Sequence, residues 1–131
     1  MPERPVRELR LAYTVEHYEG AVRFYRDALG LPVIEEWDRP SGSGAILDAG
    51  RATLELLSVS QSDLVDRVEV GEVVSGPVRL ALEVEDSEET ASALASAGAQ
   101  KIGGPVVTPW AHKNVRLRTP DGMQLTLFTV L

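Results

Sequence analysis

The sequence contains no cysteine, and its basic residues are outnumbered by acidic ones. Without cysteine, disulfides, thiolate nucleophiles and cysteine metal sites are excluded. The 13 Lys and Arg residues against 20 Asp and Glu give a formal net charge of −7, which disfavours nucleic-acid binding because that function needs a basic face. No apolar run reaches the length of a membrane span, and the start, MPERPVRE, does not resemble a signal peptide. We therefore expect a cytoplasmic protein with neither nucleic acid nor membrane as a partner.

Aromatic residues are also scarce, at 5% of the chain, so Trp37 and Trp110 are prominent candidates for a binding role. Apolar residues make up 44% of the sequence, which is enough for a folded core and argues against disorder. The negative charge would attract a cationic small molecule over long range, although surface acidity also serves solubility.

Two similar stretches, Arg10–Glu16 (RLAYTVE) and Arg79–Glu85 (RLALEVE), share Arg, Leu, Ala, Val and Glu at matching positions. Their alternating apolar residues predict strands, and each stretch runs into a helical pattern. Later in each half, Leu54–Val59 (LELLSV) aligns with Leu125–Val130 (LTLFTV). The chain is therefore predicted to use one β-α-β-β-β module twice.

The remaining patterns place the elements of both modules. Helices are predicted over about 18–29 and 86–97, and strands over 9–15, 33–37, 44–48, 53–59, 78–84, 101–107, 114–118 and 123–130. We expect a single domain over 1–131, with module 1 at about 9–60, a linker at about 61–77 and module 2 at about 78–131. The acidic linker segment would pack as a flap or a short helix. The predicted fold class is α+β, with one helix on the outer face of each four-stranded sheet and a concave inner surface.

Three phrases in this order resemble the glyoxalase/bleomycin-resistance/dioxygenase superfamily, which has the vicinal oxygen chelate fold. They are AVRFYRDALGLPV, LEVEDSEETASALASAGA, and PW followed by RLRTPDGMQLTLF. The resemblance extends from about Leu9 to Leu131. It implies two βαβββ modules that curl into half-barrels around a pocket, paired either within one chain or between two chains.

The resemblance also implies where a metal would be held, and there the sequence departs from the family. Enzymes of the family use His, Gln or Glu side chains on the inward faces of four strands, and the matching positions here are Arg10, Glu55, Arg79 and Thr126. Alternation independently places Arg10 and Arg79 opposite the apolar face. Arginine remains cationic and has no lone pair for a metal, and the two histidines, His17 and His112, lie elsewhere. We therefore predict no metal and no other cofactor.

Metal-free members of the family include resistance proteins that bind an antibiotic such as bleomycin, mitomycin or an enediyne without modifying it. The resemblance to that group predicts a metal-independent binding protein that sequesters an aromatic or cationic antibiotic and confers self-resistance. We expect a homodimer with exchanged modules, because the linker is long enough for exchange. The predicted ligand-binding residues, with no catalytic residue among them, are Arg10, Trp37, Glu55, Arg79, Trp110, His112, Thr126 and Phe128.

Two other functions stay open. A metal-free lyase, isomerase or cyclase of natural-product metabolism would use Glu55, Glu83 or His112 as an acid or base, and a small-molecule carrier or regulator would need no catalytic group. Some of the candidate residues also have structural interpretations. Trp37 would then cover the core, and the pairs Arg10–Glu55 and Arg79–Glu83 would form salt bridges in place of a metal.

Overall fold

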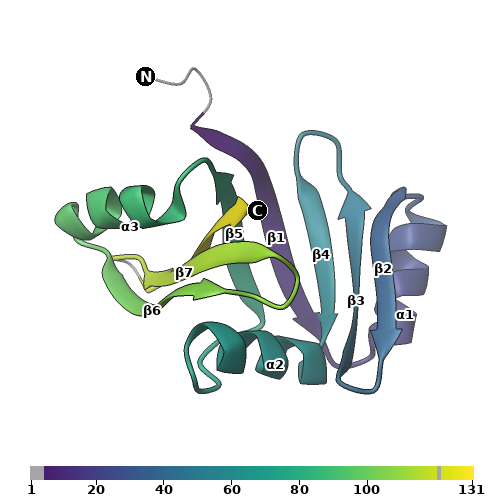
Figure 1. The fold of residues 1–131 in the computed structure, drawn as a ribbon. Helices are drawn as coiled ribbons and strands as arrows, with labels where there is room; N and C mark the ends of the chain where they lie inside the picture. The colour runs from purple at the N-terminus through teal and green to yellow at the C-terminus, as the bar shows by residue number, and fades with distance from the viewer. Residues whose placement is uncertain (1–4, 121) are drawn as a thin grey trace.

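The computed structural model describes residues 5–120 and 122–131, which form one eight-stranded sheet with helices on both of its faces (Figure 1). The first half contains β1 (Val6–Val15), α1 (Tyr18–Val22) with its π-helical continuation η1 (Arg23–Ala28), β2 (Val33–Arg39), β3 (Gly42–Asp48) and β4 (Thr53–Ser58). The helix α2 (Val59–Glu69) follows. The second half contains β5 (Val78–Val84), α3 (Ser87–Ser96), β6 (Gln100–Val107), β7 (His112–Arg118) and β8 (Gln124–Val130).

The strand order β2-β3-β4-β1-β5-β8-β7-β6 shows the internal repeat directly. In the first half β1 runs parallel to β4, and in the second half β5 runs parallel to β8. The two halves join where β1 and β5 pair antiparallel within the one chain. The predicted α+β fold of two βαβββ modules is confirmed. The two modules pair through β1 and β5 within one chain, so a single chain can form the sheet without a partner. The homodimer with exchanged modules remains a prediction.

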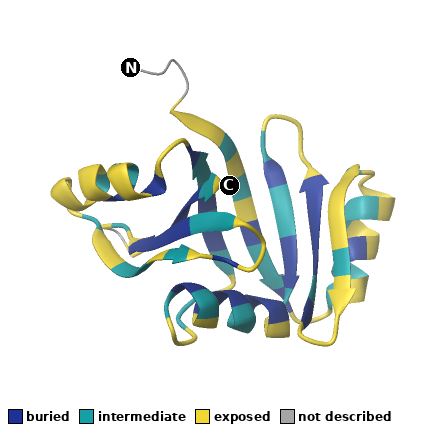
Figure 2. Ribbon diagram, in the orientation of Figure 1, coloured by how far each residue is buried: buried dark blue, intermediate teal, exposed yellow. Residues whose placement is uncertain are grey.

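The outer face of each half is covered by one helix, as expected from the apolar alternation. In the first half Val22 of α1 packs with Val15, Ala45, Leu47 and Leu56 in one apolar cluster. In the second half Ala91 of α3 packs against a second cluster that contains Val84, Val115, Leu117, Leu125 and Leu127. Figure 2 shows the consequence for burial, because β3 is largely buried while the edge strand β2 is largely exposed.

The segment predicted as a linker, which was expected to pack as a flap or a short helix, contains a third helix, α2. This helix lies on the inner face and contacts β3, β4, β6 and β7 (Figure 1). Ser58 caps α2 by accepting a hydrogen bond from the Gln61 backbone N–H at 3.2 Å. Two glycines allow the close approach at its ends: a Cβ on Gly42 would lie 2.6 Å from the Gln61 backbone, and one on Gly103 would collide with the Glu69 carbonyl oxygen. The helix therefore rests on strand backbone from both halves. Each helix in the described part of the chain is too short or too polar to cross a lipid bilayer.

Candidate functional site

The inner face of the sheet and α2 line a partly open cavity of about 180 Å³. Its walls come from both halves of the chain. All eight residues predicted to bind ligand line it: Arg10, Trp37, Glu55, Arg79, Trp110, His112, Thr126 and Phe128. The structure thus brings the whole predicted set together, and their role in binding remains a prediction.

Strand register explains how four polar side chains meet on the cavity floor. Across the β1–β5 seam, Arg10 lies opposite Ala81 and Arg79 lies opposite Ala12. The same alanines neighbour the other two positions, because Ala12 pairs with Glu55 on β4 and Ala81 pairs with Thr126 on β8. Both alanines are buried, and their small side chains leave the space that the longer polar groups enter.

The two arginines have different partners from those considered in the sequence. Arg10 donates from Nε to Glu8 Oε2 at 2.7 Å, and its Cζ lies 4.9 Å from the centre of the Phe128 ring, within cation–π range. Arg79 donates from Nη1 to Thr126 Oγ1 at 2.8 Å.

Neither the Arg10–Glu55 pair nor the Arg79–Glu83 pair forms an ion pair among the described residues. The reason lies in the sheet. Glu8 precedes Arg10 by two positions and so shares its face of β1, and Thr126 neighbours Arg79 from the adjacent strand.

Glu55 is the unengaged acid of the floor. Its carboxylate has no hydrogen bond or ion pair with any residue that the structure describes. Burial raises its pKa, and the nearby charges of Arg79 and Arg10 only partly offset that effect. His112 differs, because burial and the charge of Arg10 lower its pKa. The imidazole is therefore neutral at pH 7, and it stacks on Phe128 with ring centres 5.0 Å apart.

Both tryptophans of the chain form cavity walls. The Trp37 ring lies directly over Gly44 of β3, where an added Cβ would overlap the ring, and its Nε1 donates to Gln61 Oε1 at 3.2 Å. Trp110 lies between β6 and β7 and is 37% exposed. Trp37 therefore lies on the inner side of the sheet, away from the two outer apolar clusters, and lines the same cavity as the buried Ile46 and Leu57. The two roles considered for it, covering the core and binding ligand, both remain predictions.

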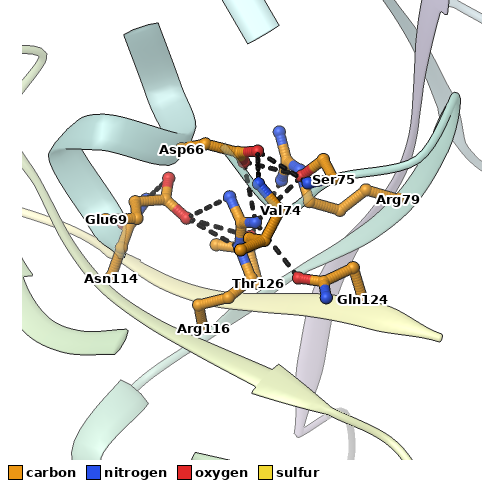
Figure 3. A network of polar contacts seen from close by, with 9 residues as sticks. All are labelled: Asp66, Glu69, Val74, Ser75, Arg79, Asn114, Arg116, Gln124 and Thr126. Atoms are coloured by element: carbon orange, nitrogen blue, oxygen red, sulfur yellow. Dashed lines mark hydrogen bonds and ion pairs between the residues drawn. The ribbon is translucent and has the colours of Figure 1, made fainter. Parts of the chain in front are cut away.

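A buried ion-pair network behind the floor was missed in the sequence (Figure 3). Arg116 on β7 has a fully buried side chain. Its Nη1 lies 2.9 Å from Asp66 Oδ1, and its Nη2 lies 2.9 Å from Glu69 Oε1, both on α2. Asp66 also accepts hydrogen bonds from the backbone N–H groups of Val74 and Ser75 at 2.8 and 2.7 Å. These contacts fix α2 and the segment after it against the second half of the sheet.

Thr126 links this network to the cavity. Its hydroxyl accepts from Arg79 and from Arg116 Nε and donates to Glu69 Oε1, at 2.8, 3.1 and 3.2 Å. A hydroxyl has one donor and two acceptor sites, so its capacity is fully used. The sequence held a signal for Arg116: Val115 and Leu117 belong to the outer apolar cluster, so alternation turns Arg116 inward.

The floor residues do not fit the divalent metal that the fold family implies. Arg10 and Arg79 project into the cavity where that metal would need ligands, and a guanidinium offers it no lone pair. Glu55 alone among the four matching positions is a good oxygen ligand. In residues 5–120 and 122–131 no group of three or more His, Cys, Asp or Glu side chains is arranged to hold a metal ion. We therefore assign no chemical step to a metal.

Comparison with known proteins places the chain in a family. The model of the Glyoxalase/Bleomycin resistance protein/Dioxygenase superfamily matches residues 9–127, whereas no curated protein matches. A solved structure of hypothetical protein BH1468 from Bacillus halodurans C-125 has a TM-score of 0.68 at 22% identity, covering 93% of this chain and 92% of that chain.

Two other solved structures share the fold. Methylmalonyl-CoA epimerase from Mycobacterium tuberculosis has a TM-score of 0.69 at 17% identity, covering 100% of this chain and 93% of that one. A superfamily member from Vibrio splendidus 12B01 has a TM-score of 0.61 at 14% identity, covering 93% and 97%. At these identities the structures support the architecture and not a shared activity. The match over 9–127 and the paired βαβββ modules show that the chain belongs to the glyoxalase/bleomycin resistance protein/dioxygenase superfamily.

Proposed function

We propose that this protein is a metal-independent small-molecule-binding protein that sequesters an aromatic antibiotic, of the bleomycin, mitomycin or enediyne type, and so confers self-resistance. One observation carries the proposal. Four rings from both halves of the chain surround a single cavity, whose floor holds arginines at the family's metal positions: Trp37, Trp110, His112 and Phe128. Aromatic walls stack on planar ligands and bury a large apolar area.

The cavity chemistry favours holding a ligand over attacking it. The described residues that line it include no Ser, Cys, Lys or Tyr. Its only hydroxyl, on Thr126, already uses its donor and both acceptor sites. A nucleophile needs an adjacent base that can take its proton, and Thr126 instead donates to Glu69, which is engaged by Arg116.

The size of the cavity limits the size of ligand that can bind inside it. Pockets for drug-sized molecules typically measure about 300–1,000 Å³, and this cavity measures about 180 Å³. Within the proposal, the cavity therefore favours a compact aromatic antibiotic over the larger bleomycin type.

A thermal-shift screen against DNA-damaging antibiotics, followed by mass spectrometry of the recovered ligand, tests the proposal. Intrinsic fluorescence gives a second readout, because both tryptophans line the cavity. Tight binding of an unaltered compound is the expected result. Metal analysis of the purified protein is the companion measurement, and a full equivalent of a divalent metal would contradict metal-independent binding.

A metal-free lyase, isomerase or cyclase is the second candidate, and Glu55 favours it. Its carboxylate is unpaired among the described residues, and its pKa is raised by burial, as suits a general acid or base. Conversion of the ligand by the wild-type protein, lost in Glu55→Gln while binding is retained, would establish this function and exclude simple sequestration.

We also propose that the protein forms a homodimer. Exchange of modules would replace the β1–β5 pairing inside one chain with the same pairing between two chains. The mass in solution tests this, and a monomer would rule it out.

A further inference from the structure

Arg79 is a buried cation whose charge no residue in the described part of the chain neutralises by an ion pair. Its side chain lines the cavity, and the residue is 7% exposed. Its hydrogen bond goes from Nη1 to the neutral hydroxyl of Thr126, which leaves the other guanidinium N–H groups uncommitted. Arg116, by contrast, is matched by Asp66 and Glu69. A buried, unpaired guanidinium is destabilising, so Arg79 is suited to an anion that arrives from outside.

Glu55 is the second group on the floor without a hydrogen-bond or ion-pair partner among the described residues, and four charged side chains surround it. Arg79 and Arg10 face it as cations, and Glu69 and Glu8 are the nearby anions. Of these, Arg10 is paired with Glu8, and Glu69 with Arg116. Because burial outweighs the two arginines, the carboxyl keeps its proton to a higher pH than an exposed glutamate. With Glu55 protonated, Arg79 is the one unmatched charge on the floor among the residues described.

We infer that the cavity binds a planar aromatic carboxylate, which accepts hydrogen bonds from Arg79 and shares a proton with Glu55, while its ring lies between the aromatic walls. The inference rests on the proposed function as an aromatic-binding protein, and it replaces the antibiotic types named there with one chemical class, an aromatic carboxylate. A charge-assisted hydrogen bond from a guanidinium to a carboxylate is among the strongest available to a protein. A cationic ligand would instead be placed beside Arg79 and Arg10.

The net charge of −7 does not oppose this conclusion. Charges at the surface are screened over about 8 Å at physiological ionic strength, whereas Arg79 acts at contact inside the cavity. The overall acidity slows the approach of an anion but leaves the contact itself intact.

Binding of the carboxylate depends on the protonation state of Glu55. A protonated Glu55 donates to the ligand carboxylate, whereas an ionised Glu55 repels it. At pH values above the ligand's own pKa, affinity for the carboxylate therefore falls as the pH rises through the range in which Glu55 loses its proton in the complex. Below the ligand's pKa affinity falls as well, because the ligand is then protonated and uncharged. Where Glu55 is ionised in the free protein, each binding event takes a proton from the buffer.

Three probes with the same ring test the ligand class by isothermal titration calorimetry at pH 7: naphthalene-2-carboxylate, naphthalene-2-carboxamide and 2-naphthylmethylammonium. The carboxylate is expected to bind about tenfold more tightly than the amide, and the cation more weakly than both. Titration at several pH values, in buffers of different ionisation enthalpy, is expected to show proton uptake with the carboxylate wherever Glu55 is ionised in the free protein. Glu55→Gln is expected to abolish that uptake while carboxylate binding persists.

Arg79→Gln should remove the preference for the carboxylate while the amide still binds, which also shows that the variant is folded. Arg51→Gln is the matched control, since Arg51 is exposed and does not line the cavity; the preference should persist. If Arg79→Gln does not fold, Arg79→Lys keeps the charge and loses the fork geometry, and a reduced preference is expected. An undiminished preference in either folded variant overturns the inference.

The outcomes separate the two proposals. If the amide or the cation binds as tightly as the carboxylate, the ligand class is wrong and aromatic binding stands. If none of the three probes binds at millimolar concentration, the proposed function fails and the inference fails with it.

Discussion

Replacement of Arg116 by Met tests whether the buried ion pairs hold α2 over the cavity. The side chains of Arg116, Asp66 and Glu69 are 0%, 1% and 2% exposed. Met fills much of the same space but leaves two buried carboxylates without a cation. Removing one partner of a buried pair costs about 3–5 kcal/mol. A domain of this kind has about 5–15 kcal/mol of stability in total, so the variant should unfold at a much lower urea concentration.

Urea unfolding at pH 7, followed by far-UV circular dichroism, gives the free energy of unfolding for the wild type, Arg116→Met, Glu69→Gln and the double variant. Because Arg116 and Glu69 act as a unit, the double variant should lose less than the two single losses combined, with a coupling of about 1–3 kcal/mol. Additive losses, or a cost below about 1 kcal/mol for Arg116→Met, would refute the reasoning.

The pH dependence of the same experiment has a defined sign. Burial alone would raise the pKa of Asp66, but hydrogen bonds from Ser75, Val74 and Arg116 outweigh it, so the pKa is lowered. A lowered folded-state pKa stabilises the protein above the unfolded value of about 3.9, and this contribution is lost as the pH falls through the folded value. The stability difference between the wild type and Arg116→Met should therefore narrow below about pH 4.

Three further changes have defined outcomes. Trp110→Ala should weaken ligand binding about tenfold with little change in Tm, because the ring is 37% exposed; unchanged affinity in a fluorescence titration would place the wall elsewhere. Gly44→Ala should displace the Trp37 ring and cost about 1–3 kcal/mol in urea unfolding, whereas Gly76→Ala, with open space around it, should not. Since burial raises the pKa of Glu55, its ionisation destabilises the fold increasingly above the unfolded value of about 4.3. Glu55→Gln should therefore raise Tm at pH 7 and not at pH 4.

The sequence predicted the sheet and the inward direction of Arg10 and Arg79 because both depend on alternation, whereas Glu55 and Thr126 of the floor were implied by the family resemblance. Leu9, Leu11 and Tyr13 mark one face of β1, so Arg10 had to lie on the other. The RLA repeat then required Arg79 to occupy the equivalent place in β5. These inferences need no knowledge of contacts, and the strand register bears them out.

From the sequence, α2 could be offered only as one of two possibilities, a flap or a short helix, because its buried face is largely polar. Gln61, Ser62, Val65, Asp66 and Glu69 are its buried residues. These residues recur at helical spacing, but only Val65 among them is apolar. A helix that is identified by its apolar stripe is therefore not visible here. What makes this face suitable for burial is Arg116, which lies far away in the sequence. The partners of Arg10 and Arg79 were missed for a related reason, since alternation predicts which way a side chain points but not which neighbour it contacts.

Fusion of the two modules frees each half to change independently. If each module were a separate chain and two identical copies paired through the β1–β5 seam, every substitution would appear in both halves, and the cavity would be symmetric. Here the matching floor positions carry Glu55 in one half and Thr126 in the other. Their neighbours on the next strand also differ, because Ile46 pairs with Glu55 whereas Arg116 pairs with Thr126. One chain therefore offers a different chemical surface to each end of a molecule, so a ligand and the same ligand turned end to end meet different contacts.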